Sequence, residues 1–323
     1  MTGTPAEASG DGAAGEGPAV TLDEVAAGGK RALAAALAEV EARPDAPATA
    51  ALLDEAFARP RGLALGLTGP PGAGKSTLTG ALIRHWRGEG LTVGVVAVDP
   101  SSAASGGALL GDRVRLGTDP ADRGVFVRSL AAGDRLGGLA AAAFPAMVLL
   151  RALFDRVIVE TVGVGQSETA IAGIADLVAL CVPPGAGDAV QHMKAGVLEI
   201  PDVVAVTKAD LGAPAARTRA GLTAALSMAA RVPPVVACSA ATGEGITALA
   251  EALADAARSL GDAAGRHRAQ ANQWAEQDIA SRFGSETLSL IRKKTVDNLA
   301  ETPFTALQML QSRLSAAIRS AFP

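Results

Sequence analysis

The sequence predicts a doubly wound α/β fold: a mostly parallel sheet with helices on both faces, a helical segment before it and a helical arm after it. Six short apolar runs alternate with longer amphipathic segments between residues 62 and 257. The runs are rich in Val and Leu and do not alternate apolar with polar positions, which is typical of strands buried on both faces. Past about residue 258 such runs stop and helical patterns take over. The expected strands occupy residues 62–67, 93–98, 156–160, 177–182, 203–207 and 234–239.

These patterns divide the chain into four segments. Residues 1–20 form a polar, acidic leader rich in Gly and Ala, which we expect to be disordered. A helical N-terminal segment covers residues 21–61, the sheet domain covers 62–257, and the helical arm covers 258–323. The leader lacks the basic start and apolar middle of a secretory signal and the Arg content of a transit peptide. We therefore expect a cytoplasmic protein.

Composition and charge exclude several classes of function. The formal net charge is −4 and no basic block occurs, so nothing indicates a nucleic-acid interface. No apolar run approaches the roughly 18 residues that a membrane span needs. The two cysteines, Cys181 and Cys238, each end an apolar run and are expected to be buried small side chains. The three histidines form no metal-ligand cluster by spacing.

The N-terminal segment carries the start signal of a helix. Thr21 and Glu24 have the spacing of a capping box, in which each side chain accepts a hydrogen bond from the other residue's backbone. Leu33, Leu37 and Val40 then recur at helical spacing, although the Gly pair at positions 28 and 29 weakens the start of the helix. We expect one amphipathic helical preface here.

The arm ends in a second well-marked helix. Thr302 is its predicted cap and Pro303 lies in its first turn, where proline is tolerated. A single apolar stripe follows, made of Leu307, Leu310, Leu314 and Ile318. A stripe alone does not name its partner, so packing on the sheet domain and packing on a second subunit both remain open.

Residues 69–76, GPPGAGKS, match the phosphate-loop pattern GxxxxGK[ST] between a predicted strand and a predicted helix. Glycines allow backbone N–H groups to turn toward a phosphate, and the helix N-terminus adds its positive dipole. We expect Lys75 to contact the β- and γ-phosphates and the Ser76 hydroxyl to bind Mg²⁺. The residues predicted to hold the nucleotide phosphates are Gly69, Gly72, Ala73, Gly74, Lys75, Ser76 and Thr77.

Mg²⁺ also needs hard oxygen ligands at the end of a strand. Asp99 ends the run VGVVAVD and Glu160 ends RVIVE, so both are candidate metal ligands together with Ser76. Glu160 also opens the sequence ETVG. Gly163 of that sequence could turn its N–H toward the γ-phosphate and make the segment a nucleotide-sensing switch.

Two further stretches predict recognition of guanine. Thr207, Lys208 and Asp210 form a TKxD box directly after a strand. An Asp carboxylate can accept from both N1–H and the exocyclic amine of guanine, a donor pair that adenine lacks, so a buried carboxylate would penalise adenine. After the next strand, Ser239 and Ala240 can present a backbone N–H to guanine O6. GTP is therefore the expected nucleotide, and GDP the product.

Three blocks closely resemble the MeaB/ArgK/MMAA family of P-loop GTPases: VAVDPSSAASGGALLGDRVRL, VIVETVGVGQSE and DAVQHMKAGVLEIPDVVAVTKAD. The resemblance covers nearly the whole chain beyond the leader. It implies a GTP-hydrolysing chaperone that gates adenosylcobalamin loading and removal for an acyl-CoA mutase of the methylmalonyl-CoA mutase type, protecting or reactivating it. It also implies a homodimer joined through the arm, with adenosylcobalamin reached only through the partner mutase.

The resemblance carries further roles onto matching positions. It implies that Asp112 is an acidic switch residue near the metal and the hydrolytic water. It assigns Asp188, Gln191 and Lys194 to a mobile segment that relays the nucleotide state to the mutase; ordinary solvated helix positions are the alternative. The catalytic residues are then Lys75, Asp99, Asp112 and Glu160. The group that orients the water is Asp99, Asp112 or a backbone carbonyl, and the choice stays open.

The sequence departs from the family pattern at two places. Thr207 stands where Asn is commoner, a change that can loosen a tether but leaves the carboxylate of Asp210 in place. The relay segment has Pro183, Pro184 and Ala189 where the family often has a Gly-rich run and a second Asp, so its signalling details are open.

Other functions remain as alternatives. A metal-delivery GTPase of the hydrogenase or urease maturation type shares the fold but would need Cys or His ligands near the switches. An ArgK-like kinase or transport ATPase predicts an ATP preference, which Asp210 opposes. A non-hydrolysing interaction protein would not need an intact phosphate loop with two acids. Which acyl-CoA mutase is served cannot be read from the sequence.

Overall fold

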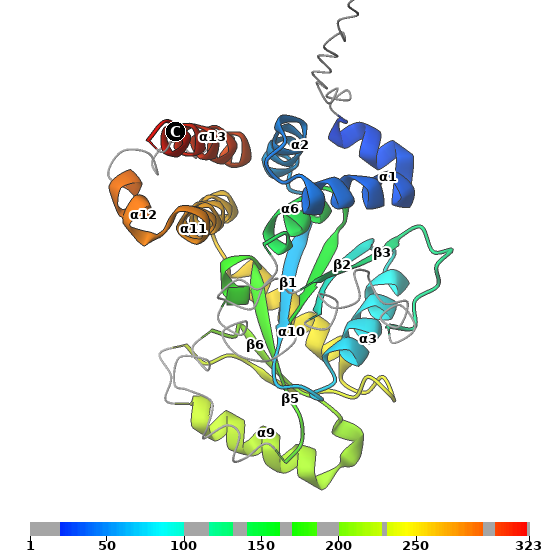
Figure 1. Cartoon of the computed structure of the whole chain (residues 1–323). Helices are drawn as coiled ribbons and strands as arrows, with labels where there is room; N and C mark the ends of the chain where they lie inside the picture. Colours follow the sequence, from blue (N-terminus) through cyan, green and yellow to red (C-terminus); the bar gives the residue numbers. More distant parts are fainter. Residues whose placement is uncertain are drawn as a thin grey trace, which may run out of the picture.

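The computed structural model describes residues 20–99, 116–131, 141–161, 170–185, 200–227, 231–292 and 301–321 (Figure 1). Its centre is a seven-stranded sheet with the strand order β3-β2-β4-β1-β5-β6-β7. Every described strand pair is parallel. The predicted doubly wound α/β class is confirmed, and β1 occupies the middle of the sheet.

The strands begin and end close to the predicted apolar runs. Their bounds are β1 Leu63–Thr68, β2 Val93–Asp99, β3 Val125–Ala131, β4 Arg156–Glu160, β5 Leu177–Val182, β6 Val203–Val206 and β7 Val235–Ala237. The edge strand β3 is absent from the sequence-based prediction. Arg128 and Ser129 interrupt its apolar pattern. Arg128 is half-buried at the edge of the sheet, where a polar side chain can leave the core, whereas Ser129 is buried. Arg128 uses this position for an ion pair with Glu41 of the N-terminal helix.

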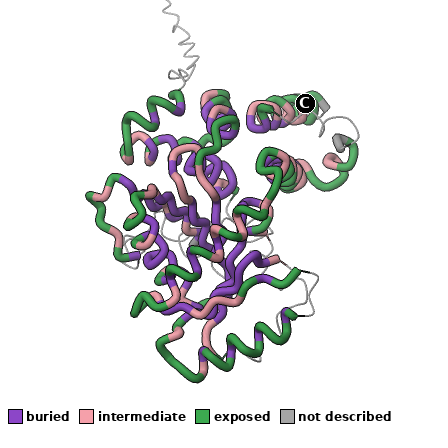
Figure 2. Tube along the Cα trace, turned by 180° about the vertical axis from the view of Figure 1, so that it is seen from behind, coloured by how far each residue is buried: buried purple, intermediate pink, exposed green. Residues whose placement is uncertain are grey.

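Helices cover both faces of the sheet. On one face α3 (Lys75–Gly88) and α10 (Ile246–Arg258) pack on the odd-numbered side chains of β5, including Leu177 and Cys181. On the other face α6 (Ala143–Leu153) and α9 (Ala213–Leu226) pack on the even-numbered ones. Both faces of the central strands are therefore buried, which explains their continuous apolar runs. Figure 2 shows the buried sheet surrounded by helices whose outer faces are exposed.

Both cysteines are buried and free, as expected. Burial raises the pKa of the Cys238 thiol to about 11 and raises that of Cys181 further. Within the described residues no helix is long and apolar enough to cross a membrane.

The N-terminal preface consists of two helices, α1 (Leu22–Ala42) and α2 (Pro47–Ala58). The predicted capping box is present: the Thr21 N–H donates to the Glu24 carboxylate at 2.8 Å and the Glu24 N–H to Thr21 Oγ1 at 3.2 Å. Gly29 has a non-helical φ of +61° and kinks α1 where the sequence indicated a weak start. The predicted apolar positions beyond the kink are buried.

The arm consists of α11 (Ala263–Phe283), α12 (Ser285–Arg292) and α13 (Pro303–Ala321). Helix α13 packs against α2 and α11, so the arm and the N-terminal helices meet on the side of the molecule where α6 lies (Figure 1). Of the predicted stripe, Leu307 is buried, Leu310 and Leu314 are half-buried, and Ile318 is 49% exposed. This chain therefore covers only the first part of the stripe.

Candidate nucleotide site

The predicted phosphate loop joins the carboxyl end of β1 to the N-terminus of α3, at the centre of the sheet. Gly69, Gly72 and Gly74 have φ values of +135°, +74° and +89°, which L-residues with a side chain rarely adopt. A Cβ on Gly69 would also lie 2.2 Å from the carbonyl oxygen of Cys181. The loop thus needs glycine for its conformation and for its close approach to β5.

Lys75 is the first residue of α3, and only 7% of it is exposed. Its Nζ donates to the carbonyl oxygens of Gly69 at 2.8 Å and Pro70 at 3.1 Å. These bonds fold the side chain back over the loop and fix a positive charge beside the loop amides. Ser76 is half-buried and Thr77 is exposed in the same first turn of the helix.

Glu160 lies directly beside this turn. It ends β4 and pairs with Leu67 of β1, which places its carboxylate at the start of the phosphate loop. The Ser76 hydroxyl donates to Glu160 Oε1, and the Thr79 hydroxyl donates to Oε2 at 3.1 Å. Sequence reasoning missed Thr79. Its spacing of three residues from Ser76, on the same helix face, was the available signal.

The other candidate acid occupies the neighbouring strand. Asp99 ends β2, whose Ala97 pairs with Glu160, so the two acids end adjacent strands at one edge of the sheet. Only the backbone of Asp99 is described. The predicted residues Asp112, Gly163, Asp188, Gln191 and Lys194 lie outside the described residues, as does the leader through position 19.

The donor atoms at this edge have the chemistry that Mg²⁺ requires. Mg²⁺ prefers hard oxygen ligands and usually keeps water and substrate phosphates in its shell, so one or two protein oxygens suffice. The Ser76 hydroxyl and the Glu160 carboxylate converge beside the phosphate loop. Among the described residues no group of three or more His, Cys, Asp or Glu side chains could hold a metal by itself. These residues therefore fit Mg²⁺ bound together with a nucleotide.

The TKxD box contacts the phosphate loop directly. Thr207 Oγ1 donates to the carbonyl of Ala73 at 2.6 Å, and Lys208 Nζ donates to the carbonyl of Gly72 at 2.9 Å. Lys208 has a φ of +53°, a left-handed backbone conformation that is costly for a residue with a side chain. The hydroxyl of Thr207 therefore connects the TKxD box to the phosphate loop, and the expected loosening of this tether is not seen.

The second guanine element lies against Asp210. Ser239 is fully buried, and its hydroxyl donates to Asp210 Oδ1 at 2.6 Å while accepting from the Thr242 N–H at 3.2 Å. The Ser239 N–H donates to the carbonyl of Glu244 at 2.8 Å. Of the two predicted donors to guanine O6, the amide of Ala240 is therefore the candidate. The structure brings the TKxD box and the Ser239 segment together at the ends of β6 and β7. Asp210 itself is exposed, whereas the sequence argument expected a buried carboxylate; only its partner Ser239 is buried.

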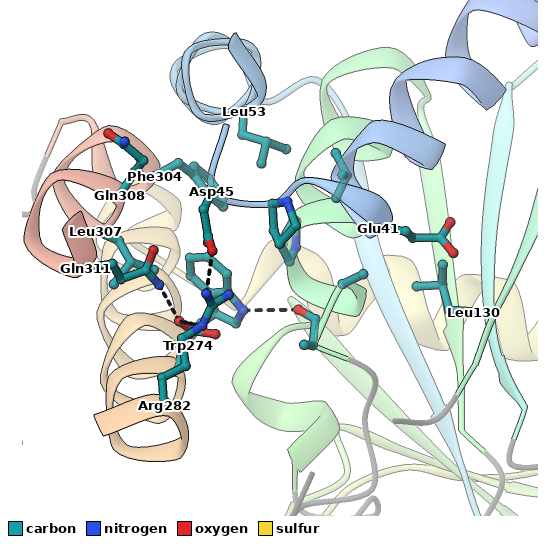
Figure 3. Close-up of a pocket in the computed structure, with 16 residues that line it drawn as sticks. Glu41, Asp45, Leu53, Leu130, Trp274, Arg282, Phe304, Leu307, Gln308 and Gln311 are labelled. Atoms are coloured by element: carbon teal, nitrogen blue, oxygen red, sulfur yellow. Dashed lines mark hydrogen bonds and ion pairs between the residues drawn. The ribbon is translucent and has the colours of Figure 1, made fainter. Parts of the chain in front are cut away.

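A separate cavity of about 340 Å³ lies between the N-terminal helices, α6 and the arm (Figure 3). Trp274, Phe304 and Leu307 line its apolar part. At its polar rim Arg282 pairs with Asp45 at 2.5 Å and Asp278 at 2.8 Å. None of the residues predicted to bind the nucleotide lines this cavity, so it is distinct from the phosphate-loop site.

Comparison with known proteins adds sequence relatives to this geometry. A family model described as methylmalonyl-CoA mutase-associated GTPase MeaB matches residues 33–291. A relative from Pyrococcus horikoshii is 48% identical over 197 residues, which are 58% of this chain and 62% of that protein. The mitochondrial methylmalonic aciduria type A homolog of Mus musculus is 37% identical over 227 residues, 67% of this chain and 55% of the relative. The chain thus spans less than two thirds of either curated relative.

One solved structure matches most of the chain. It is described as a LAO/AO transport system kinase, is 28% identical, and has a TM-score of 0.63. The match covers 91% of this chain and 96% of that chain.

Proposed function

Because the chain belongs to the MeaB family of methylmalonyl-CoA mutase-associated GTPases, we propose that it binds GTP at the phosphate loop and hydrolyses it to GDP and phosphate. The observation that carries this proposal is the direct contact between the TKxD box and the phosphate loop. Thr207 and Lys208 hold the loop carbonyls of Ala73 and Gly72 within 2.9 Å. The segment proposed to recognise the base is therefore hydrogen-bonded directly to the loop proposed to bind the phosphates.

Guanine selection rests on Asp210 and Ala240. The Asp210 carboxylate accepts from the two donors on the guanine edge, and the Ala240 N–H donates to O6. Ser239 fixes one oxygen of that carboxylate from a fully buried position. Adenine presents an acceptor where guanine presents N1–H, so it leaves the carboxylate without a donor and repels it.

In this proposal the nucleotide phosphates bind the backbone N–H groups of the phosphate loop and the side chain of Lys75. Phosphoryl transfer to water needs positioning and neutralisation of charge more than covalent chemistry. Ser76, Asp99 and Glu160 would hold Mg²⁺, which supplies positive charge to the β- and γ-phosphates when bound. Lys75 is already held over the loop by two carbonyls, so its charge is in place before a nucleotide arrives.

The family description, which names methylmalonyl-CoA mutase, supports a partnership with an acyl-CoA mutase. In this proposal the protein is a cytoplasmic homodimer joined through residues 258–323, and GTP hydrolysis gates the loading and removal of adenosylcobalamin on the mutase. The state of the nucleotide would reach the mutase through Asp112, Asp188, Gln191 and Lys194. Such a switch works only if the two nucleotide states contact the mutase differently.

Nucleotide titration tests the proposal most directly. With Mg²⁺ present, we expect GDP to bind the purified chain at least about a hundredfold more tightly than ADP, because a site built for two donors rejects a base lacking them by large factors. Calorimetry with GDP, ADP and the corresponding triphosphates measures this ratio. Equal binding of ADP and GDP, or binding of neither, contradicts the assignment.

A second experiment tests the partnership. We expect GTP turnover by the isolated chain to be slow and to rise when its cognate mutase is added, because in this proposal the mutase completes the catalytic site. Methylmalonyl-, ethylmalonyl-, isobutyryl- and hydroxyisobutyryl-CoA mutases are the candidates. Acceleration by none of them, together with no capture in pull-downs with GDP or a non-hydrolysable GTP analogue, contradicts the chaperone role.

A kinase or transport ATPase is the second candidate, because the matching solved structure carries that name. This candidate predicts transfer of phosphate to an acceptor and a preference for ATP. Phosphate released from GTP in the absence of any acceptor favours the hydrolase instead. A metal-delivery GTPase has less support, because it would need Cys or His ligands near the switches and both cysteines, Cys181 and Cys238, are buried.

A further inference from the structure

Two hydroxyl groups from one helix hold the carboxylate of Glu160. Ser76 and Thr79 stand three residues apart on α3, on the same face, and donate to the two different oxygens of Glu160. Glu160 is 8% exposed and Thr79 is fully buried. One carboxylate oxygen thus accepts a hydrogen bond from Ser76 of the phosphate loop, and the other accepts one from Thr79, which lies one turn farther along α3.

The hydroxyls of Ser76 and Thr79 have different roles toward Glu160 in this proposal. Under the proposed function Ser76 offers its oxygen to Mg²⁺, so its position changes with the occupancy of the site. Thr79 is buried behind it and lies one turn farther from the phosphate loop. Its hydrogen bond to Oε2, 3.1 Å long, therefore holds that oxygen in place independently of the metal.

The backbone around Glu160 is already fixed by its neighbours. Glu160 pairs with Leu67 on one side and Ala97 on the other, so only the torsions of its side chain are left to be set. Thr79 is β-branched, which restricts its own χ1 in a helix. A stiff donor on a rigid helix can hold the flexible carboxylate in one orientation, as outer-shell partners of metal ligands commonly do.

We propose that Thr79 is a positioning residue, which orients the Glu160 carboxylate toward Mg²⁺ and thereby sets the affinity of the nucleotide site for the metal. This inference rests on the proposed function, because it requires a guanine nucleotide site that uses Mg²⁺. The competing explanation is that the Thr79 hydroxyl only satisfies a buried carboxylate and contributes to stability alone.

Release of a fluorescent GDP analogue, measured while Mg²⁺ is titrated, separates the two explanations. Thr79→Val keeps the shape of the side chain and removes the donor. We expect it to raise the Mg²⁺ concentration for half-maximal retention by about tenfold, the lower end of the effect of losing an outer-shell partner. Release in EDTA should be unchanged, and Thr79→Ser, which keeps the hydroxyl, should stay within about threefold of wild type.

Thr223→Val is the matched control, because Thr223 is exposed on α9 and donates only to the carbonyl of Arg219. An unaltered Mg²⁺ requirement in Thr79→Val, or equal shifts in Thr79→Val and Thr79→Ser, overturns the inference. Circular dichroism checks folding, and Thr79→Ala removes the same donor if the valine variant does not fold. Wild-type protein that retains GDP equally with and without Mg²⁺ refutes the magnesium role itself, a result distinct from failure of the Thr79 inference.

Discussion

At the scale of single residues, the candidate site depends on short side-chain contacts between segments that are distant in sequence. Ser239 reaches Asp210 across 29 positions, and Thr207 reaches Ala73 across 134. In each contact a hydroxyl is the donor. The acceptor is the carboxylate of Asp210 in one case and the backbone carbonyl of Ala73 in the phosphate loop in the other. The function of these hydroxyls is to orient other groups, so their removal should change nucleotide affinity more than stability.

Asp210→Ala tests the guanine assignment at this scale. It removes two charge-assisted hydrogen bonds, each worth about 1.5–3 kcal/mol, so we expect GDP affinity to fall at least about a hundredfold. ADP affinity should stay the same or rise, because adenine has no donor facing this carboxylate and the variant removes its repulsion of adenine N1. Ser239→Ala should cost less, about tenfold, since it loosens Asp210 without removing it. Calorimetry measures the GDP and ADP affinities of both variants. Asp255→Ala, which removes an exposed carboxylate on α10, is the control. Equal losses of affinity for GDP and ADP contradict the assignment.

At the scale of elements, a carboxylate from the N-terminal segment caps the last helix of the arm. Asp54 of α2 accepts from the N–H groups of Phe304 and Thr305, both at 2.9 Å, in the first turn of α13. Those N–H groups have no partner within the helix itself. Phe304 packs beside them on Phe57 and Trp274. Hydrogen bonds and aromatic contacts together attach the arm to the start of the chain.

Asp54→Ala therefore should weaken the attachment of α13. Loss of a helix cap costs about 0.5–2 kcal/mol, and we expect a loss of about this size in the free energy of unfolding. Urea denaturation followed by circular dichroism measures it. Glu251→Ala, an exposed carboxylate on α10, is the control and should change stability little. A stability loss without change in GDP binding is expected, because the hydrogen bonds described for Asp54 join it to α13 and not to the phosphate loop.

At the scale of the whole molecule, one buried carboxylate joins three layers. Asp176 precedes β5, accepts from the Ala64 N–H of β1 at 2.8 Å, and bonds His267 of α11 at 2.9 Å. Arg151 of α6 and Arg266 of α11 lie 3.7 and 3.5 Å from the same carboxylate. Burial raises the pKa of Asp176, but the His267 hydrogen bond, the Arg151 charge and the Ala64 amide outweigh it and leave the pKa lowered.

Asp176→Asn should destabilise the chain by about 3–5 kcal/mol at neutral pH, because it leaves buried cations without their counter-charge. A lowered pKa in the folded state means that the carboxylate stabilises the protein above its unfolded pKa of about 3.9 and loses this effect as the pH falls through the folded pKa. The stability difference between wild type and variant should therefore shrink below about pH 4. Denaturation midpoints at several pH values test this, and a difference independent of pH contradicts it.

The contacts of Asp54 and Asp176 could not be predicted from the sequence. Asp54 stands 250 residues before Phe304 and its own neighbourhood carries no capping signal for α13. Asp176 precedes a predicted strand and looks like an ordinary acid at a strand end. The edge strand β3 was also missed because of a long-range contact. The charge of Arg128 argues against a strand in the sequence, and only the structure shows that Glu41 pairs with it.

The sequence by itself determined the central strands and the phosphate loop between strand and helix, and it predicted the TKxD box as the site of guanine recognition. These features depend on local properties: glycines at left-handed backbone positions, apolar runs long enough for one strand, and donors and acceptors within one short loop. Only the tertiary structure decided that Thr79 grips Glu160, that Ser239 orients Asp210, and that α13 docks on α2. Those contacts depend on which strands and helices become neighbours, and neighbour choice is settled by packing of the whole chain rather than by any window of sequence.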